Sequence, residues 1–185
     1  MSTVTAPVAT TTTWNIDSVH SSAQFKVKHM MISNVKGDFT TVTGSLKFDG
    51  ENIANSYVEA SIDARTINTC DAQRDAHLKS PDFFDVEKFP VLTFKSTRIS
   101  TKSGGELTVA GELTIHGVTR PVVFEVEGPS APMKDPWGNT RLGLSASTRI
   151  NRKDFGLTWN AALETGGILV GEEVAINLDV QFIKA

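Results

Sequence analysis

The stretch that decides the fold is VAINLDVQF, residues 174–182. Its large apolar side chains fall on every second position, and small or polar side chains fall between them. Strict two-residue alternation is typical of a β-strand that buries one face. The same pattern recurs in residues 22–29, 107–115, 122–126 and 142–150. The chain is therefore predicted to be an all-β protein.

Weaker strand patterns surround the clear ones, at residues 14–17, 37–48, 57–63 and 91–97. Turn sequences rich in glycine, proline, asparagine and aspartate separate them. Because short connections between successive strands favour antiparallel pairing, the strands should follow one another as hairpins. Roughly eight or nine amphipathic strands in a chain of this length predict a closed barrel or a sandwich.

One segment, residues 71–88, breaks the alternation. Its composition predicts a short helical insert, with a helix that ends before Pro81. The insert carries Phe83, Phe84 and Phe89, which is a large aromatic area for a connection. Two interpretations stay open: the segment closes one end of a barrel, or it forms a satellite hydrophobic cluster under a long connection.

Charge and composition narrow the function classes. The formal net charge is −3 and no Lys/Arg cluster overrides it, so nucleic-acid binding is not expected. Cys70 is the single cysteine, so no intramolecular disulfide can form. No apolar run approaches the roughly 20 residues that span a bilayer, so no integral membrane segment is expected.

The amino terminus, Met1–Thr13, contains neither Lys nor Arg, and Pro7 and six threonines interrupt its apolar residues. A secretory signal needs a positive start and a continuous apolar stretch. We therefore expect a disordered tail at residues 1–13, a single domain at residues 14–185, and a cytoplasmic location.

The histidines offer no recognisable metal or catalytic motif. His20, His29, His77 and His116 lack paired spacings such as His-x-His. No nucleophile elbow or phosphate-binding loop is present either. We therefore expect no metal, no catalytic residue and no cofactor, apart from a bound lipid.

Arg74, Asp75 and His77 are the one suggestive polar group, and a helix would bring Arg74 and His77 onto neighbouring positions. They are either a surface or semi-buried ion pair, or a cationic contact for an anionic lipid head group.

A set of short motifs follows in a specific order and spacing. They are DSVHSS (17–22), FKVKH (25–29), KGDF (36–39), RDAHL (74–78), FFD (83–85), FP (89–90), LTF (92–94), GELTIHGVT (111–119) and DFGL (154–157). Together they resemble the YceI family of lipocalin-like, polyisoprenoid-binding proteins, from Trp14 to the end of the chain. The resemblance implies an eight-stranded antiparallel barrel, extended relative to lipocalins. It also implies an apolar lumen for an isoprenoid, a quinone-like lipid or a similar amphiphile, a possible homodimer, and no established catalytic residues.

The inward rows and the aromatic insert supply the candidate ligand-binding residues at the lumen or its mouth. They are Phe25, Val27, His29, Phe39, Phe83, Phe84, Phe94, Leu113, Ile115, Phe124, Leu144, Ala146, Ile176 and Leu178, with Arg74 and His77 as head-group candidates. Large and small side chains mix in these rows, which leaves room for a cavity, although a filled barrel has the same alternation.

Three functions are consistent with these features. The leading hypothesis is a non-catalytic binding or carrier protein for a long apolar isoprenoid or similar lipid. The second is an enzyme that acts on a small apolar substrate in the same barrel, with His20, His29 or His77 as acid or base. The third is a ligand-free structural domain.

Overall fold

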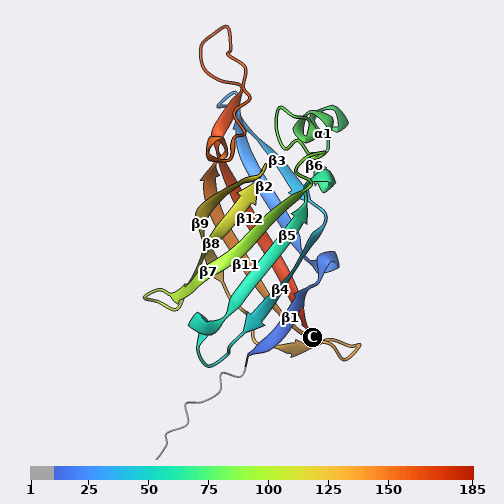
Figure 1. The fold of residues 1–185 in the computed structure, drawn as a ribbon, viewed down its shortest axis with the longest axis vertical. Helices are drawn as coiled ribbons and strands as arrows, with labels where there is room; N and C mark the ends of the chain where they lie inside the picture. Colours follow the sequence, from blue (N-terminus) through green and yellow to red (C-terminus); the bar gives the residue numbers. More distant parts are fainter. Residues whose placement is uncertain (1–10) are drawn as a thin grey trace, which may run out of the picture.

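A closed β-barrel makes up most of the computed structural model, which describes residues 11–185. Within these residues, twelve strands form one antiparallel sheet. The strands are β1 (Thr12–Ile16), β2 (Ser22–His29), β3 (Ser33–Phe39), β4 (Val42–Phe48), β5 (Tyr57–Asp63), β6 (Ile67–Asn68), β7 (Val91–Thr101), β8 (Leu107–Ile115), β9 (Val118–Glu127), β10 (Met133–Lys134), β11 (Thr140–Asn151) and β12 (Val170–Lys184). Eight of them, in the order β11-β9-β8-β7-β5-β4-β1-β12, close the barrel because β11 also pairs with β12 (Figure 1). The predicted all-β, eight-stranded antiparallel barrel is confirmed.

The wall of the barrel is extended toward one end by β2, β3 and β6. The longest strand, β12, pairs with β1 through Phe182 and Lys184 and with β2 from Val170 to Asp179. The first two strands therefore continue each other along β12, with the short 3-10 helix η1 (Ser18–His20) between them. In the same way β3 and β4, which are consecutive in the chain, continue each other. β3 pairs with β6, and β4 pairs with β5. These continuations explain the extended shape that the family resemblance implies.

The two ends of the barrel differ. One end carries the helix α1 (Ala72–Lys79), the β2–β3 hairpin and residues 156–169, which connect the 3-10 helix η4 (Arg152–Phe155) to β12 (Figure 1). We call this the capped end. The other end carries the carboxy terminus, β1 and the 3-10 helix η2 (Ile53–Asn55); the fourth 3-10 helix, η3 (Ala64–Thr66), joins β5 to β6.

The predicted insert is present, but only its first part is helical. The Asp71 carboxylate caps the helix by accepting a hydrogen bond from the main-chain N–H of Arg74. Beyond Ser80 the chain forms turns up to β7, and Asp85 has a left-handed backbone with φ 47°. Pro81 explains the end of the helix, because the residue before a proline is pushed away from the helical region.

The domain begins slightly earlier than predicted. β1 starts at Thr12, two residues before the boundary expected at Trp14, so Thr12 and Thr13 belong to the barrel and not to a tail. Trp14 is 2% exposed and anchors this strand in the core. The expectation of a disordered tail otherwise concerns residues 1–10, which lie outside the described residues.

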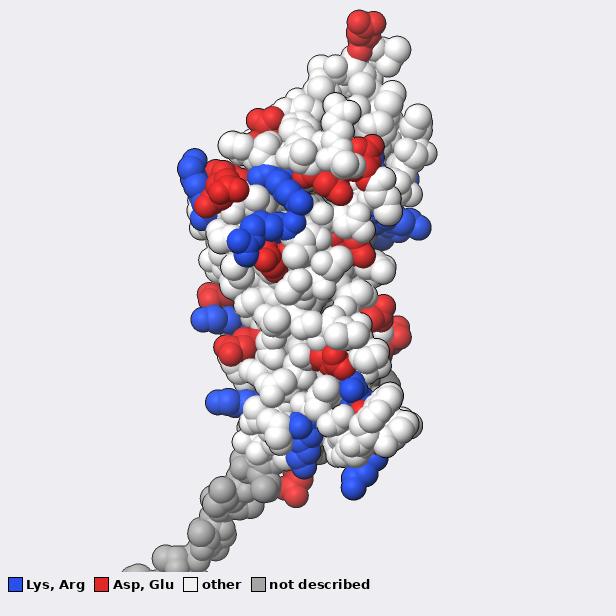
Figure 2. Space-filling view, turned by 90° about the vertical axis from the view of Figure 1, so that its right-hand side faces the viewer, with Lys and Arg blue, Asp and Glu red and all other residues white. Residues whose placement is uncertain are grey.

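The buried apolar side chains form three clusters along the barrel axis, whereas acidic and basic side chains are interspersed on the outer surface (Figure 2). One lies at the capped end around Phe39 and Phe155, one in the middle around Val109 and Phe124, and one at the opposite end around Trp14. Among residues 11–185, no helix has the length and apolar character needed to cross a membrane.

Candidate ligand cavity

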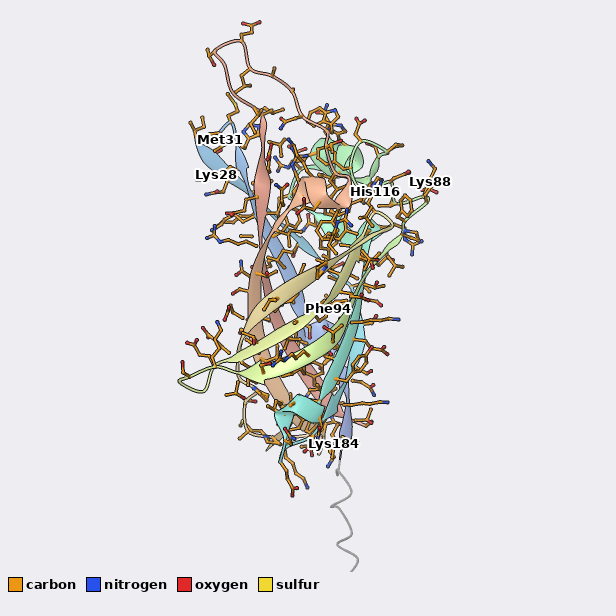
Figure 3. All side chains as sticks on the ribbon, turned by 60° about the vertical axis from the view of Figure 1, so that its left-hand side comes forward. Lys28, Met31, Lys88, Phe94, His116 and Lys184 are labelled. Carbon is orange, nitrogen blue, oxygen red and sulfur yellow. The ribbon has the colours of Figure 1, made fainter. Side chains whose placement is uncertain are left out.

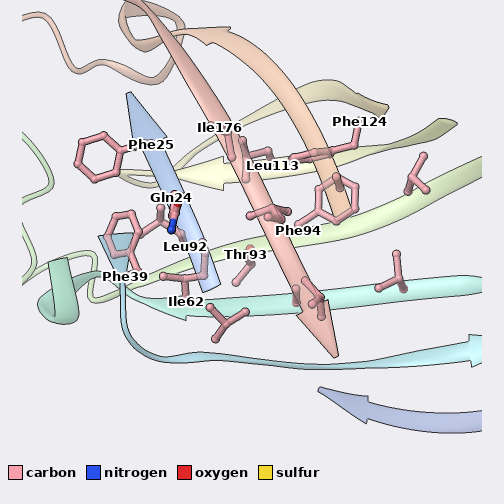
Figure 4. A pocket seen from close by; sticks show the side chains of 18 of the residues that line it. Gln24, Phe25, Phe39, Ile62, Leu92, Thr93, Phe94, Leu113, Phe124 and Ile176 are labelled. Atoms are coloured by element: carbon pink, nitrogen blue, oxygen red, sulfur yellow. The ribbon is translucent and has the colours of Figure 1, made fainter. Parts of the chain in front are cut away.

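An apolar cavity of about 250 Å³ lies inside the barrel. It reaches from Phe48 and Ile53 near the carboxy-terminal end to Phe83 and Leu157 at the capped end. The cavity follows from the strand period, since the wall is built mainly from side chains at alternate, inward positions of the barrel strands. Figure 4 shows this wall, with Phe94 and other side chains from several strands directed into one space.

Nearly all the predicted lumen residues lie on the cavity wall. They are Phe25, Val27, Phe39, Phe83, Phe84, Phe94, Leu113, Ile115, Phe124, Leu144, Ala146, Ile176 and Leu178. Large rings and small side chains alternate here: the Phe94 and Phe124 rings meet edge to face with centroids 5.2 Å apart, and Ala146 leaves space on β11. Whether these residues contact a ligand stays a prediction.

His29 is the exception among the predicted lumen residues. It occupies the last position of β2, where it pairs with Ser33 across the hairpin and with Val170 of β12. It does not line the cavity, although its row partners Phe25 and Val27 do. The alternation places His29 on the inward row, but Val27 is the last residue of β2 that lines the cavity, and a position of His29 at the mouth remains a prediction.

The cavity offers very few groups that form hydrogen bonds. Of the described residues that line it, four have polar side chains: Gln24, Ser56, Thr93 and Arg152. Ser56 already engages the protein, since its hydroxyl accepts a hydrogen bond from the N–H of Asp49 at 2.9 Å. Such a wall binds by apolar burial, which distinguishes ligands by length and bulk rather than by functional group.

Arg152 is a buried charge at the capped end that the sequence analysis did not single out. Its side chain is 4% exposed and donates to the carbonyls of Gly171 at 2.8 Å, Leu157 at 2.6 Å, Trp159 at 2.8 Å and Val170 at 3.3 Å. Burial lowers the pKa of its guanidinium, and Glu172 raises it by a smaller amount. Arg152 therefore acts as a clamp that joins η4, the following loop and the start of β12.

An aromatic cap closes this end of the cavity; we define it as Phe39, His77, Phe83, Phe84 and Trp159. The Phe84 and Phe39 rings meet edge to face with centroids 5.8 Å apart. The centroid of the His77 ring lies 5.1 Å from that of Phe83 and 4.7 Å from that of Trp159. Phe83 and Phe84 themselves line the cavity. Of the two interpretations of the insert, the structure supports the one in which it closes an end of the barrel.

The two head-group candidates both take part in contacts inside the insert or with the segment just before it. Arg74 donates from Nε to Thr69 Oγ1 at 2.8 Å and from Nη2 to Thr69 O at 2.9 Å, while Asp75 accepts from the same hydroxyl at 2.6 Å. His77 Nε2 lies 2.9 Å from an Asp82 carboxylate oxygen. Arg74 and His77 do not line the cavity. These contacts position the insert, and a head-group role remains a prediction.

The end opposite the cap has a packed floor, which we define as Trp14, Leu142 and Phe182. Each of these side chains is 2% exposed. They belong to one buried cluster with Leu46 and Val180, and Phe182 also lines the cavity.

An ion triad lies at the same end as the floor. The Arg141 guanidinium contacts Asp17 at 2.5 Å and Asp135 at 2.7 Å, which ties η1 to the β10–β11 hairpin. The hydrogen bond from Arg141, followed by that from His20, lowers the pKa of Asp17 to about 2. The same guanidinium holds the pKa of Asp135 far below its ordinary value. Both carboxylates are therefore charged wherever the protein is near neutral pH.

The four histidines do not gather at the cavity. His20 contacts Asp17, His77 contacts Asp82, and the His116 ring packs against Phe89 at 4.8 Å. Across residues 11–185, no three His, Cys, Asp or Glu side chains are arranged to hold a metal ion.

The fold and its cavity define the class of protein: an extended, lipocalin-like β-barrel that encloses an apolar space. Residues 14–182 match the YceI-like domain, and the chain belongs to that family. A UPF0312 protein of Vibrio cholerae is 43% identical over 138 residues, which cover 75% of this chain and 72% of that protein.

Two solved structures have the same fold. The YCEI protein of Campylobacter jejuni superposes with a TM-score of 0.70 and 29% identity, covering 86% of this chain and 91% of that one. A polyisoprenoid binding domain from Saccharophagus degradans, described as implicated in plant cell wall breakdown, superposes with a TM-score of 0.68 and 16% identity. This chain is covered to 93% and that domain to 98%.

Proposed function

We propose that this protein binds one long apolar lipid, of isoprenoid or similar type, inside the barrel and carries it without chemical change. The observation that carries the proposal is the cavity wall, where Gln24, Ser56, Thr93 and Arg152 are the polar exceptions among apolar side chains. A hydrocarbon chain can enter such a space without losing hydrogen bonds, whereas a polar ligand would lose its contacts with water. The Saccharophagus degradans domain of the same fold, named as polyisoprenoid binding, supports the choice of ligand.

Apolar burial is sufficient for useful affinity. At about 25 cal/mol per Å², a chain that buries roughly 300 Å² gains about 7 kcal/mol before the cost of ordering it. The placement of the histidines supports a role without catalysis, because His20, His29, His77 and His116 are not among the residues that line the cavity. A general acid or base has to reach the reacting group of its substrate.

The test begins with lipid extraction of purified protein and a native mass spectrum of the same sample. We expect one lipid per chain, or a delipidated protein that takes up one molecule of a prenyl quinone or a prenyl phosphate in a fluorescence titration. Trp159 in the cap is a suitable reporter, because it contacts Phe83 of the cavity wall. Clean extracts together with no binding below tens of micromolar would show that the lipid proposal is wrong. Analytical ultracentrifugation of the same sample tests the homodimer that the family resemblance implies.

A further inference from the structure

The tip of the β2–β3 hairpin presents three consecutive apolar side chains to solvent. Met30 is 40% exposed, Met31 60% and Ile32 79%. Single exposed apolar residues are ordinary, but a contiguous group on a protruding loop marks a surface that contacts something apolar. Figure 3 shows Met31 on the outside of the molecule at the capped end, below the tip of the loop that projects furthest.

The backbone of this tip is unfavourable for the residues that occupy it. Met30 and Met31 have φ of 50° and 60°, in the left-handed region where glycine and asparagine are the usual residues. Glycine or asparagine would make the same turn with less strain. Strain of this kind at an exposed position is typical of a functional site, here one that needs the side chains.

Three lysines lie on the outer face of the same hairpin, just below the tip. Lys26 and Lys36 are direct cross-strand partners, and Lys28 lies two residues from Lys26 on the same face. Like charges placed opposite each other destabilise a sheet. Within the part of the chain that the structure describes, none of the three forms an ion pair. Their positive charge is available to an external anion, and Figure 3 shows Lys28 close beneath Met31.

The tip is fixed beside the cap of the cavity. The Met30 N–H donates to the Leu169 carbonyl at 2.7 Å, which ties the hairpin to the loop before β12. Arg152 and Trp159 connect that loop to the cap. Two carboxylates add negative charge at this end: Asp38 lies on the outer face of β3 two residues from Lys36, and Glu164 is exposed in the loop before β12.

We propose that this hairpin docks the capped end of the barrel onto an anionic lipid bilayer. Met31 and Ile32 enter the head-group region, and Lys26, Lys28 and Lys36 lie against the lipid phosphates. An apolar group flanked by basic side chains matches a surface that is apolar inside and negatively charged outside. The proposal concerns the outer surface, so its test does not depend on which ligand the cavity binds.

The test is flotation of the whole protein with vesicles at low and high salt. We compare vesicles of phosphatidylcholine alone with vesicles that contain phosphatidylglycerol in addition. The wild-type protein should float with the anionic vesicles and dissociate as salt rises, since surface charges are screened. The double variant M31S/I32S and the variant K28E should each reduce the vesicle-bound fraction at least fivefold, and E164Q should increase it.

The matched control is Trp137→Ser, which removes an 82% exposed apolar side chain near the opposite end and should leave flotation unchanged. Melting temperatures verify that each variant is folded. The proposal is overturned if the wild-type protein does not associate with anionic vesicles at low salt, or if it associates equally with neutral ones. It is also overturned if W137S loses as much binding as M31S/I32S, or if M31S/I32S instead converts a dimer to a monomer without changing flotation.

Discussion

Ala146→Phe tests whether the barrel is hollow where a ligand would lie. Ala146 is 9% exposed in the middle of β11, opposite Leu178 of β12 and Val126 of β9, and it lines the cavity. A phenylalanine here places its ring in the cavity without altering the outer surface of the barrel.

Two opposing contributions determine how much Ala146→Phe changes the free energy of unfolding. Filling about 80 Å³ of empty space at roughly 24 cal/mol per Å³ stabilises the lipid-free protein by about 2 kcal/mol. Forced rotamers and small backbone shifts cost about 1–3 kcal/mol in a packed interior and less in an empty one. We therefore expect the stability of the lipid-free variant to stay within about 1 kcal/mol of the wild type, or to increase.

Lipid binding should respond much more strongly. A ring that displaces only two methylene groups of the ligand removes about 1.6 kcal/mol, which is more than a tenfold loss of affinity. Urea denaturation gives the stability and lipid titration gives the affinity. The matched control is Ala175→Phe on β12, whose neighbours in the sheet are Arg149 and Lys26 and which does not line the cavity. It should leave lipid affinity unchanged.

Two results would refute this reasoning. A loss of more than about 3 kcal/mol in the lipid-free variant would mean that the interior is filled, because only overpacking costs that much at this position. An unchanged lipid affinity in a stable variant would mean that the ligand does not occupy the middle of the barrel.

Three further substitutions test the Arg152 clamp, the close packing around Gly111 and the ion triad of Arg141. Arg152→Met leaves four carbonyls without their donor, which costs about 1–3 kcal/mol for each carbonyl that water does not reach. Urea denaturation should therefore show a free energy of unfolding lower by at least about 3 kcal/mol. An unchanged free energy of unfolding would mean that the clamp is dispensable. Gly111→Ala should lower stability by about 1–3 kcal/mol, since a Cβ there would lie 2.5 Å from an aromatic ring of the cavity wall; an unchanged melting temperature would contradict this. Arg141→Met should flatten the acid branch of the curve of stability against pH. Because the folded pKa values of Asp17 and Asp135 are depressed, these carboxylates stabilise the wild type above their unfolded pKa, and the contribution is lost as pH falls toward about 2. Parallel curves for the wild type and the variant would refute the assignment.

The two-residue alternation was enough to predict the barrel and most of its wall. Inward positions such as Leu113 and Ile176 follow directly from the strand period, because a one-residue shift would move every side chain to the other face. The period does not reveal where the lumen stops along a strand. His29 therefore lies on the inward row of β2 without lining the cavity.

Arg152 could not be recognised from its sequence surroundings. It follows Arg149 and precedes Lys153, both exposed and both paired with glutamates of β12, so the segment has the pattern of a solvated face. Its burial depends on carbonyls contributed by residues 157–171, which the chain brings together only after the loop folds back. The role of Trp159 in the cap was missed for the same reason, since its partners come from the insert.

The packed floor has a consequence for chain length. On the proposed function, a lipid tail that extends toward this end meets Phe182 of the cavity wall, with Trp14 and Leu142 in the same buried cluster. Up to that depth, each added methylene buried should improve affinity by about 0.8 kcal/mol, or roughly fourfold. Beyond it, further carbons have to stay in water or fold back, and the increase should stop. The depth of the cavity would thus select ligands by chain length. In a series of prenyl chains, the binding free energy plotted against chain length should show a single break in slope.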